Sequence, residues 1–242
     1  MRRRERVSPN HAERPPDTPV DVLVLHYTGM QSAAAALDRL CDPQARVSSH
    51  YVVEEDGAVW QLVDERRAAF HAGVSSWRGQ DALNGRSVGI EIVNPGHEWG
   101  YRAFPPEQVD AVEALCRAVL ARHPIPPGNV VAHSDVAPER KQDPGELFPW
   151  AQLADRGIGL WPLGVPHLGD AAPVTDPPSL RPVRVGLAEI GYRVAPEGGH
   201  DEPLAAVLRA FQRHWRPETV NGLADRGTRA RLAGLRWLIR TR

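Results

Sequence analysis

Short runs of branched apolar residues recur through the first two thirds of the chain and predict the strands of a sheet. The segments Val20–His26 (VDVLVLH) and Ser87–Val93 (SVGIEIV) are almost continuously apolar, which is typical of strands buried on both faces. The segment His50–Val63 predicts a β-hairpin, because Asp56 and Gly57 form a turn signal between its two apolar runs.

Between these strands the apolar residues follow a helical spacing. Residues 31–40 (QSAAAALDRL) predict an alanine-rich helix, and residues 105–120 predict a longer amphipathic helix with prolines on both sides. A short strand is expected at residues 129–133. Strands that alternate with helices in this way predict an α/β fold, a central mixed β-sheet flanked by helices.

The two ends of the chain differ from this middle part. Pro15, Pro16 and Pro19 predict a flexible N-terminal arm over residues 1–19, and residues 163–179 are rich in Pro, Gly, Asp and Ala without periodicity, which is typical of a linker. Residues 180–242 return to a helical pattern and predict a small three-helix C-terminal domain. The α/β domain would therefore span residues 20–162.

Composition and charge exclude several classes of protein. The net charge of -1, from 29 basic and 30 acidic side chains, argues against a general nucleic-acid binder. No apolar run reaches the roughly 20 residues that a transmembrane helix needs. Two cysteines cannot form a disulfide framework or a cysteine-rich zinc site.

One residue type is almost missing from the chain. Lys141 is the single lysine, against 28 arginines. Arginine replaces lysine readily on a surface but not at a site that needs a compact ammonium group, so Lys141 is either a functional residue or a chance survivor.

Three potential metal ligands lie at or just after predicted strands. His26 and His133 each end a strand, where side chains emerge into a surface crevice, and Asp143 follows in a proline-containing loop. Two histidines and one aspartate would fill three positions of a tetrahedral zinc site and leave the fourth open, as in catalytic zinc sites. Each histidine alone could equally be a hydrogen-bonded structural residue.

A carboxylate stands within the second apolar strand. Glu91 would be costly there unless it is paired or functional, although it could also be an exposed position that alternates with Ile90 and Ile92. Beside a dication, Glu91 could act as a general base toward water, and Lys141 could stabilise an oxyanion. Together these residues predict metal-assisted hydrolysis of an amide or a related acyl group.

Five ordered blocks give the chain a family resemblance over residues 20–161. They are VDVLVLHYTGM, SSHYVVEEDGAVWQLV, FHAGVSSWRG, LNGRSVGIEIVN and VAHSDVAPERKQDPGELFPW, and they resemble the bacterial branch of the zinc-dependent N-acetylmuramoyl-L-alanine amidases (amidase type 2). The resemblance implies one Zn²⁺ per chain held by His26, His133 and Asp143, with Glu91 and Lys141 as catalytic residues. It also implies a mixed sheet flanked by helices, with zinc at the floor of a groove.

Other residues in these blocks are expected to line the substrate groove. His71, Trp77 and Asn94 are the candidates. The C-terminal region, through LAEIGY, AVLRAFQRHW and GLADRGTRARL, resembles the three-helix peptidoglycan-binding domain. Its alternative role is that of a helical appendage that stabilises the fold.

The resemblance implies hydrolysis of the amide between the lactyl group of N-acetylmuramic acid and L-alanine, in peptidoglycan or its (anhydro-)muropeptide fragments, during cell-wall turnover and recycling. The alternative is a non-catalytic peptidoglycan-binding or sensing protein, which would not need the complete ligand set. The chain begins with charged residues but no apolar segment follows them, so this segment as written does not have the pattern of a secretory signal, and a cytoplasmic enzyme is expected. A peptidoglycan-binding domain instead favours the periplasm or cell envelope, which would apply if the N-terminus is misassigned or trimmed, and both locations stay open.

Overall fold

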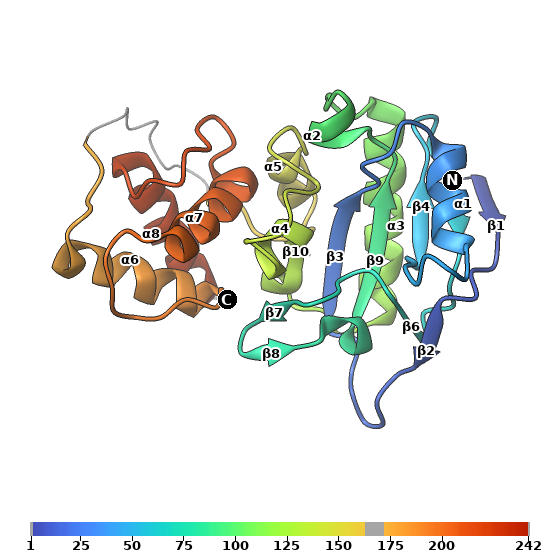
Figure 1. Ribbon diagram of the computed structural model, residues 1–242, viewed down its shortest axis with the longest axis horizontal. Helices are drawn as coiled ribbons and strands as arrows, with labels where there is room; N and C mark the ends of the chain where they lie inside the picture. The colour runs from blue at the N-terminus through green and yellow to red at the C-terminus, as the bar shows by residue number, and fades with distance from the viewer. Residues whose placement is uncertain (1, 163–171, 242) are drawn as a thin grey trace.

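A six-stranded mixed sheet forms the centre of the molecule, whose computed structural model describes residues 2–162 and 172–241 (Figure 1). The order across the sheet is β1-β5-β4-β9-β3-β10; β4 and β5 are antiparallel, and the other neighbouring pairs are parallel. The strands are β1 (Arg2–Glu5), β3 (Val22–Tyr27), β4 (Tyr51–Val53), β5 (Ala58–Gln61), β9 (Ser87–Ile92) and β10 (Val130–Ala132). Two-stranded sheets pair β2 (His11–Glu13) with β6 (Arg67–Ala69), and β7 (Ser76–Trp77) with β8 (Gln80–Asp81).

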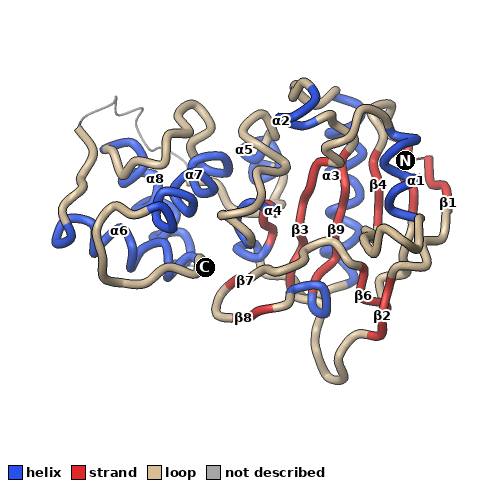
Figure 2. The backbone as a smooth tube through the Cα atoms, viewed as in Figure 1, coloured by secondary structure: helices blue, strands red, loops and turns tan. Residues whose placement is uncertain are grey.

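Helices lie on both faces of the central sheet and beside one edge (Figure 2). Within the described residues, none has the length and apolar character that a membrane span requires. The expected mixed sheet flanked by helices is therefore confirmed. The α-helices are α1 (Ala33–Cys41), α2 (Gly96–Trp99), α3 (Pro106–Arg122), α4 (His133–Val136), α5 (Trp150–Asp155), α6 (Pro177–Ile190), α7 (Glu202–Trp215) and α8 (Arg226–Thr241), with 3-10 helices at Leu83–Arg86 and Pro127–Asn129.

Strand alternation decides which side chains can reach the functional site. In β3, Leu25 packs in the core that includes α3, while Val24 faces a second core on the opposite side. In β9, Ile90 belongs to the α3 core. Because successive side chains of a strand point to opposite faces, His26 and Glu91 lie on the face away from α3.

The N-terminal segment differs from the expected flexible arm. Residues 2–5 form the edge strand β1, and residues 11–13 form β2. The guanidinium of Arg14 also donates hydrogen bonds to the carbonyl oxygens of Glu65 and Gly85, each at 2.9 Å. Backbone pairing and side-chain hydrogen bonds hold this segment, and a search for apolar periodicity does not detect either.

The helices α6, α7 and α8, called the C-terminal helices below, lie beside α4 and β10 (Figure 1). Residues 163–171 of the expected linker lie outside the described residues. The expected C-terminal boundary of the linker, residue 179, differs from the structure, because α6 already begins at Pro177. The side chain of Asp176 caps α6 by accepting a hydrogen bond from the Ser179 amide.

The C-terminal helices do not bury their apolar faces among themselves alone. Phe211 of α7 and Leu232 of α8 share one core with Val24 and Val131 of the sheet and with Leu160. A segment of about 63 residues is close to the lower limit for a core of its own. Packing on the open face of the sheet supplies the missing apolar surface.

Candidate metal centre and catalytic pocket

Three side chains converge at the carboxyl ends of β3 and β10. The Nδ1 atoms of His26 and His133 are 2.9 Å apart, and the Oδ2 atom of Asp143 is 3.1 Å from the first and 2.9 Å from the second. All three residues are buried, and their ligand atoms could hold a metal ion. Three corners of a tetrahedron with bonds of about 2 Å are about 3.3 Å apart, so the spacing suits a small dication such as zinc.

The protonation states of this cluster also suit a cation. Burial, followed by the nearby His133, lowers the pKa of His26 to about 4. Burial alone would raise the pKa of Asp143, but the charges and hydrogen bonds of His133 and His26 outweigh it and hold the pKa below its usual range. At neutral pH the cluster therefore offers a neutral imidazole and an ionised carboxylate, the forms that ligate metals.

Backbone contacts fix the direction in which His133 presents its ring. Its Nε2 atom is 3.2 Å from the carbonyl oxygen of Ala72, which can only accept, so Nε2 carries the proton and the Nδ1 lone pair faces Asp143. The loop that carries Asp143 is tied to the same turn, because the Ser134 amide donates to the Asp143 carbonyl oxygen at 3.0 Å.

Glu91 lies on the strand next to His26 and directly opposite it in the β3–β9 register. Its Oε2 atom is buried and has no hydrogen-bond partner among the described residues. Burial, and then the negative charge of Asp143, raise the pKa of Glu91 well above its usual value. A carboxyl group with a raised pKa and a buried oxygen that has no hydrogen-bond partner is typical of a proton-transfer site.

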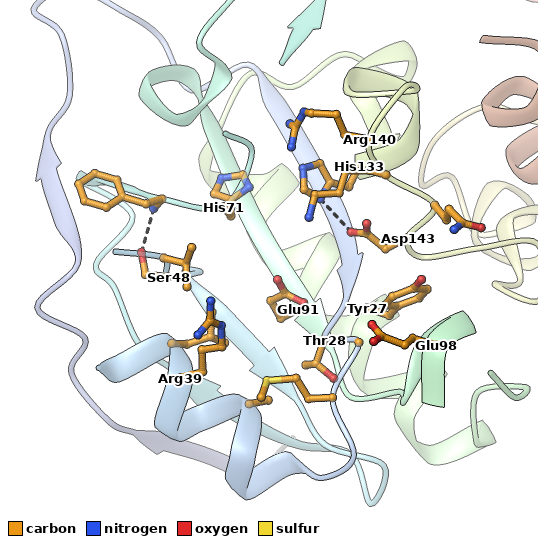
Figure 3. Close-up of a pocket in the computed structure, with 18 residues that line it drawn as sticks. Tyr27, Thr28, Arg39, Ser48, His71, Glu91, Glu98, His133, Arg140 and Asp143 are labelled. Atoms are coloured by element: carbon orange, nitrogen blue, oxygen red, sulfur yellow. Dashed lines mark hydrogen bonds and ion pairs between the residues drawn. The ribbon is translucent and has the colours of Figure 1, made fainter. Parts of the chain in front are cut away.

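A cavity of about 440 Å³ brings these groups together. Its lining includes Glu91, His133, Lys141 and Asp143, and Figure 3 shows Glu91, His133 and Asp143 around the same space. The positive charge of Lys141 lowers the pKa values of both His26 and Glu91, although it is a minor influence on each. The structure thus brings together all five residues that the sequence singled out for chemistry.

His71 lies in the wall of this cavity and contacts a candidate ligand. Its Nδ1 atom is 3.0 Å from Nε2 of His26, and its Nε2 atom is 3.0 Å from Oγ of Ser87. Gly89 makes room for the ring, because a Cβ atom there would approach Cγ of His71 to 2.5 Å. Burial, and then His26, lower the pKa of His71 well below its usual value, so the ring is neutral.

Two of the expected groove residues lie elsewhere. Trp77 is only 1% exposed and packs edge-on against Tyr192, with its indole donating to the Gly128 carbonyl oxygen at 3.3 Å. Asn94 is also 1% exposed, and its amide bonds to the backbone of Gly96 and Arg102. Neither side chain is among the residues that line this cavity, and both serve the packing around it.

Sequence reasoning missed a buried cluster directly behind the metal ligands. Asp135, on the same short helix as His133, is hydrogen-bonded to His214 of α7 and to Tyr192, which follows α6. No sequence pattern links Tyr192 or His214 to Asp135, because they lie 57 and 79 positions away along the chain. The contacts form only when the C-terminal region packs against the sheet. The one hint in the sequence was the position of Asp135 itself, within the block VAHSDVAPERK that also contains His133.

Comparisons with known proteins agree with this geometry. The family model for N-acetylmuramoyl-L-alanine amidase matches residues 16–146. The chain is similar to N-acetylmuramoyl-L-alanine amidase AmiD of Escherichia coli, with 43% identity over 228 residues that cover 87% of this chain and 80% of that protein. It is also similar to 1,6-anhydro-N-acetylmuramyl-L-alanine amidase AmpD of Citrobacter freundii, with 33% identity over 60% of this chain and 85% of that protein.

Two solved structures match nearly the whole chain. The complex of E. coli AmiD with the substrate anhydro-N-acetylmuramic acid-L-Ala-D-gamma-Glu-L-Lys has a TM-score of 0.79 and 38% identity, covering 93% of this chain and 96% of that chain. AmpDh3 from Pseudomonas aeruginosa, in complex with anhydromuramic pentapeptide, has a TM-score of 0.76 and 30% identity, covering 97% of this chain and 98% of that chain.

Proposed function

The chain belongs to the N-acetylmuramoyl-L-alanine amidase family, and from this premise we propose how its residues perform the reaction. The enzyme hydrolyses the amide bond between N-acetylmuramic acid and L-alanine in cell-wall recycling, as the sequence predicted. The observation that carries the mechanism is the convergence of His26, His133 and Asp143 beside Glu91, whose Oε2 atom has no hydrogen-bond partner among the described residues.

One zinc ion per chain would be held by His26, His133 and Asp143, whose ligand atoms Nδ1, Nδ1 and Oδ2 face one another. The donor set supports this assignment, since two neutral imidazoles and one carboxylate suit zinc and leave a fourth position open. When bound, zinc supplies Lewis-acid polarisation of the amide carbonyl and lowers the pKa of water. The remaining chemistry falls to the side chains of the cavity.

Glu91 is the general base and then the general acid. Its carboxylate takes a proton from the water that attacks the lactyl carbonyl carbon, and returns it to the nitrogen of the departing L-alanine. Burial supports this role, because a carboxylate whose pKa is raised is a stronger base than an exposed one. The ammonium group of Lys141 offsets the negative charge that develops on the carbonyl oxygen.

His71 orients a ligand through a directed chain of hydrogen bonds, in addition to its place in the cavity wall. If Nδ1 of His26 ligates the metal, its Nε2–H must donate to Nδ1 of His71. The Nε2–H of His71 then donates to Oγ of Ser87, whose hydroxyl donates to the Leu83 carbonyl oxygen at 2.7 Å. Each donor in this chain meets one acceptor, so the tautomer of His26 is fixed.

The substrate class follows from the relatives. The E. coli AmiD structure holds anhydro-N-acetylmuramic acid-L-Ala-D-gamma-Glu-L-Lys as its substrate. We assign the same class, anhydro-muropeptides with L-alanine at the amide to be cleaved, to the cavity beside Glu91.

The C-terminal helices form a peptidoglycan-binding domain in this proposal. Support comes from their number and from the segments LAEIGY, AVLRAFQRHW and GLADRGTRARL. A Glu91→Gln variant tests this role, because it cannot digest the wall. The variant is expected to sediment with purified sacculi even when excess soluble anhydro-muropeptide fills the catalytic cavity. Complete release by the soluble ligand would show that the helices add no binding site.

Product analysis tests the activity. The protein is incubated with the soluble anhydro-muropeptide and separately with intact sacculi, and the products are identified by mass spectrometry. Release of peptides that begin with L-alanine is expected, with loss after chelation and recovery when zinc is restored. Cleavage of glycan bonds, or peptide release that survives complete metal removal, would contradict the proposal.

A further inference from the structure

A buried carboxylate joins the C-terminal helices to the turn that carries His133. The side chain of Asp135 is fully buried and accepts three hydrogen bonds. Oδ2 accepts from the Ala132 amide at 2.8 Å and from Nδ1 of His214 at 2.6 Å, and Oδ1 accepts from the Tyr192 hydroxyl at 2.5 Å. Ala132 belongs to the sheet, whereas Tyr192 and His214 come from the C-terminal region.

The ring of His214 is held tightly in this position. It stacks between Trp150 of α5 and Trp215 of α7, with centroid separations of 3.7 Å on both sides. Trp215 in turn donates a hydrogen bond from its indole to the Leu160 carbonyl oxygen at 3.0 Å. The side chain of His214 is 1% exposed, so its Nδ1–H has a fixed direction toward Asp135.

Asp135 controls the position of two candidate ligands. It fixes the amide of Ala132, the residue immediately before His133, at the point where β10 becomes α4. The same turn is bonded to the Asp143 loop through the Ser134 amide. A displacement of Asp135 would therefore move the backbone that carries His133 and, through Ser134, the backbone that carries Asp143.

We propose that the C-terminal region positions the metal ligands. His214 and Tyr192 are the positioning residues, and they hold the His133 turn through their hydrogen bonds to Asp135. This inference rests on the proposed zinc site. A wall-binding domain that acted only as a tether would affect large substrates alone. A domain that positions the ligands affects zinc binding itself and the turnover of small soluble substrates.

The hydrogen-bond chemistry gives the size of the effect. Loss of the His214 or the Tyr192 donor leaves this fully buried carboxylate with two hydrogen bonds instead of three, which favours rearrangement of the turn over retention of its geometry. Outer-shell substitutions around metal sites typically weaken metal affinity or activity about 10- to 100-fold. Asp135 acts on His133 through the backbone, so we expect about 10-fold, the lower end of this range.

Two substitutions of one residue separate positioning from packing. His214→Leu removes the donor, whereas His214→Asn keeps an N–H group at the δ position; both remove the stacked ring. Leu208→Ala is the control, because it removes apolar volume from the core of the same helix and leaves the three bonds of Asp135 in place. Tyr192→Phe, which removes one hydroxyl, is a milder second test should His214→Leu fail to fold.

The zinc Kd of each full-length variant is measured by competition with a chromophoric chelator, and kcat and KM are measured with a soluble anhydro-muropeptide. His214→Leu should bind zinc about 10-fold more weakly and lose kcat with little change in KM. His214→Asn and Leu208→Ala should stay close to the unaltered protein. The inference is overturned by unchanged zinc affinity in both His214→Leu and Tyr192→Phe, or by an equal loss in Leu208→Ala. If the unaltered protein binds no zinc, the proposed metal site itself is overturned, and this inference with it.

Discussion

Replacement of Glu91 by glutamine removes the proton acceptor of the cavity and keeps its size. The carboxyl group lies opposite His26 in the sheet and lines the cavity with Lys141 and Asp143. An amide cannot take a proton from water at neutral pH, so general base catalysis is lost while the metal ligands keep their positions. A single general acid–base group contributes about 10²- to 10⁴-fold in rate, which equals about 3–5 kcal/mol in the barrier.

The expected result is therefore a fall in kcat of this size with soluble anhydro-muropeptide, and little change in KM. Zinc content, measured by mass spectrometry of the purified variant, should remain at one per chain. Turnover within a few-fold of the unaltered enzyme would refute the assignment of Glu91 as the base. Loss of zinc together with activity would show instead that Glu91 helps to hold the metal.

The same substitution should stabilise the metal-free protein. Because burial raises the pKa of Glu91 above 4.5, the folded state binds this proton more tightly than the unfolded state. The stability of the unaltered protein therefore falls as the pH rises from about 4.5 toward neutrality, and Glu91→Gln lacks this fall. Urea unfolding after chelation measures the difference, and a less stable variant at pH 7 would contradict the reasoning.

Three further predictions concern other side chains. Lys141→Arg should lower kcat about 10-fold or more, since a planar guanidinium cannot replace a compact ammonium beside the oxyanion; near-normal turnover would assign the single lysine to chance. His71→Leu should weaken zinc binding about 10-fold in a chelator competition, and an unchanged Kd would remove its orienting role. Glu65 contributes stability above pH 4.5 that is lost as the pH falls toward 2, because hydrogen bonds from Arg122, Tyr51 and His123 outweigh burial and lower its pKa to about 2. Glu65→Gln should therefore lose about 1–2 kcal/mol at pH 6, allowing for partial exposure, and nearly nothing at pH 2; equal losses at both would contradict the linkage.

The sheet could be predicted from the sequence because its strands depend on local pattern, and the catalytic cluster because its residues stand in blocks that resemble an amidase family. Branched apolar runs located β3 and β9, and the Asp56-Gly57 turn located the β4–β5 hairpin. Strand alternation alone places His26 and Glu91 on one face once their strands are known.

Other features depend on contacts between distant segments, and local sequence patterns do not predict such contacts. Trp77 lies in a conspicuous block but is buried by Tyr192, more than 100 positions away. Strand β1 has no apolar run because an edge strand is held by backbone hydrogen bonds to β5. The Asp135–His214 contact likewise requires that the C-terminal helices pack on the sheet.

A crystal structure of the zinc-loaded protein, with diffraction recorded on both sides of the zinc absorption edge, tests the central claim most directly. The account predicts a single anomalous peak per chain, within about 2.0–2.2 Å of Nδ1 of His26, Nδ1 of His133 and Oδ2 of Asp143. A peak at other side chains, or no peak in crystals of active protein, would contradict it.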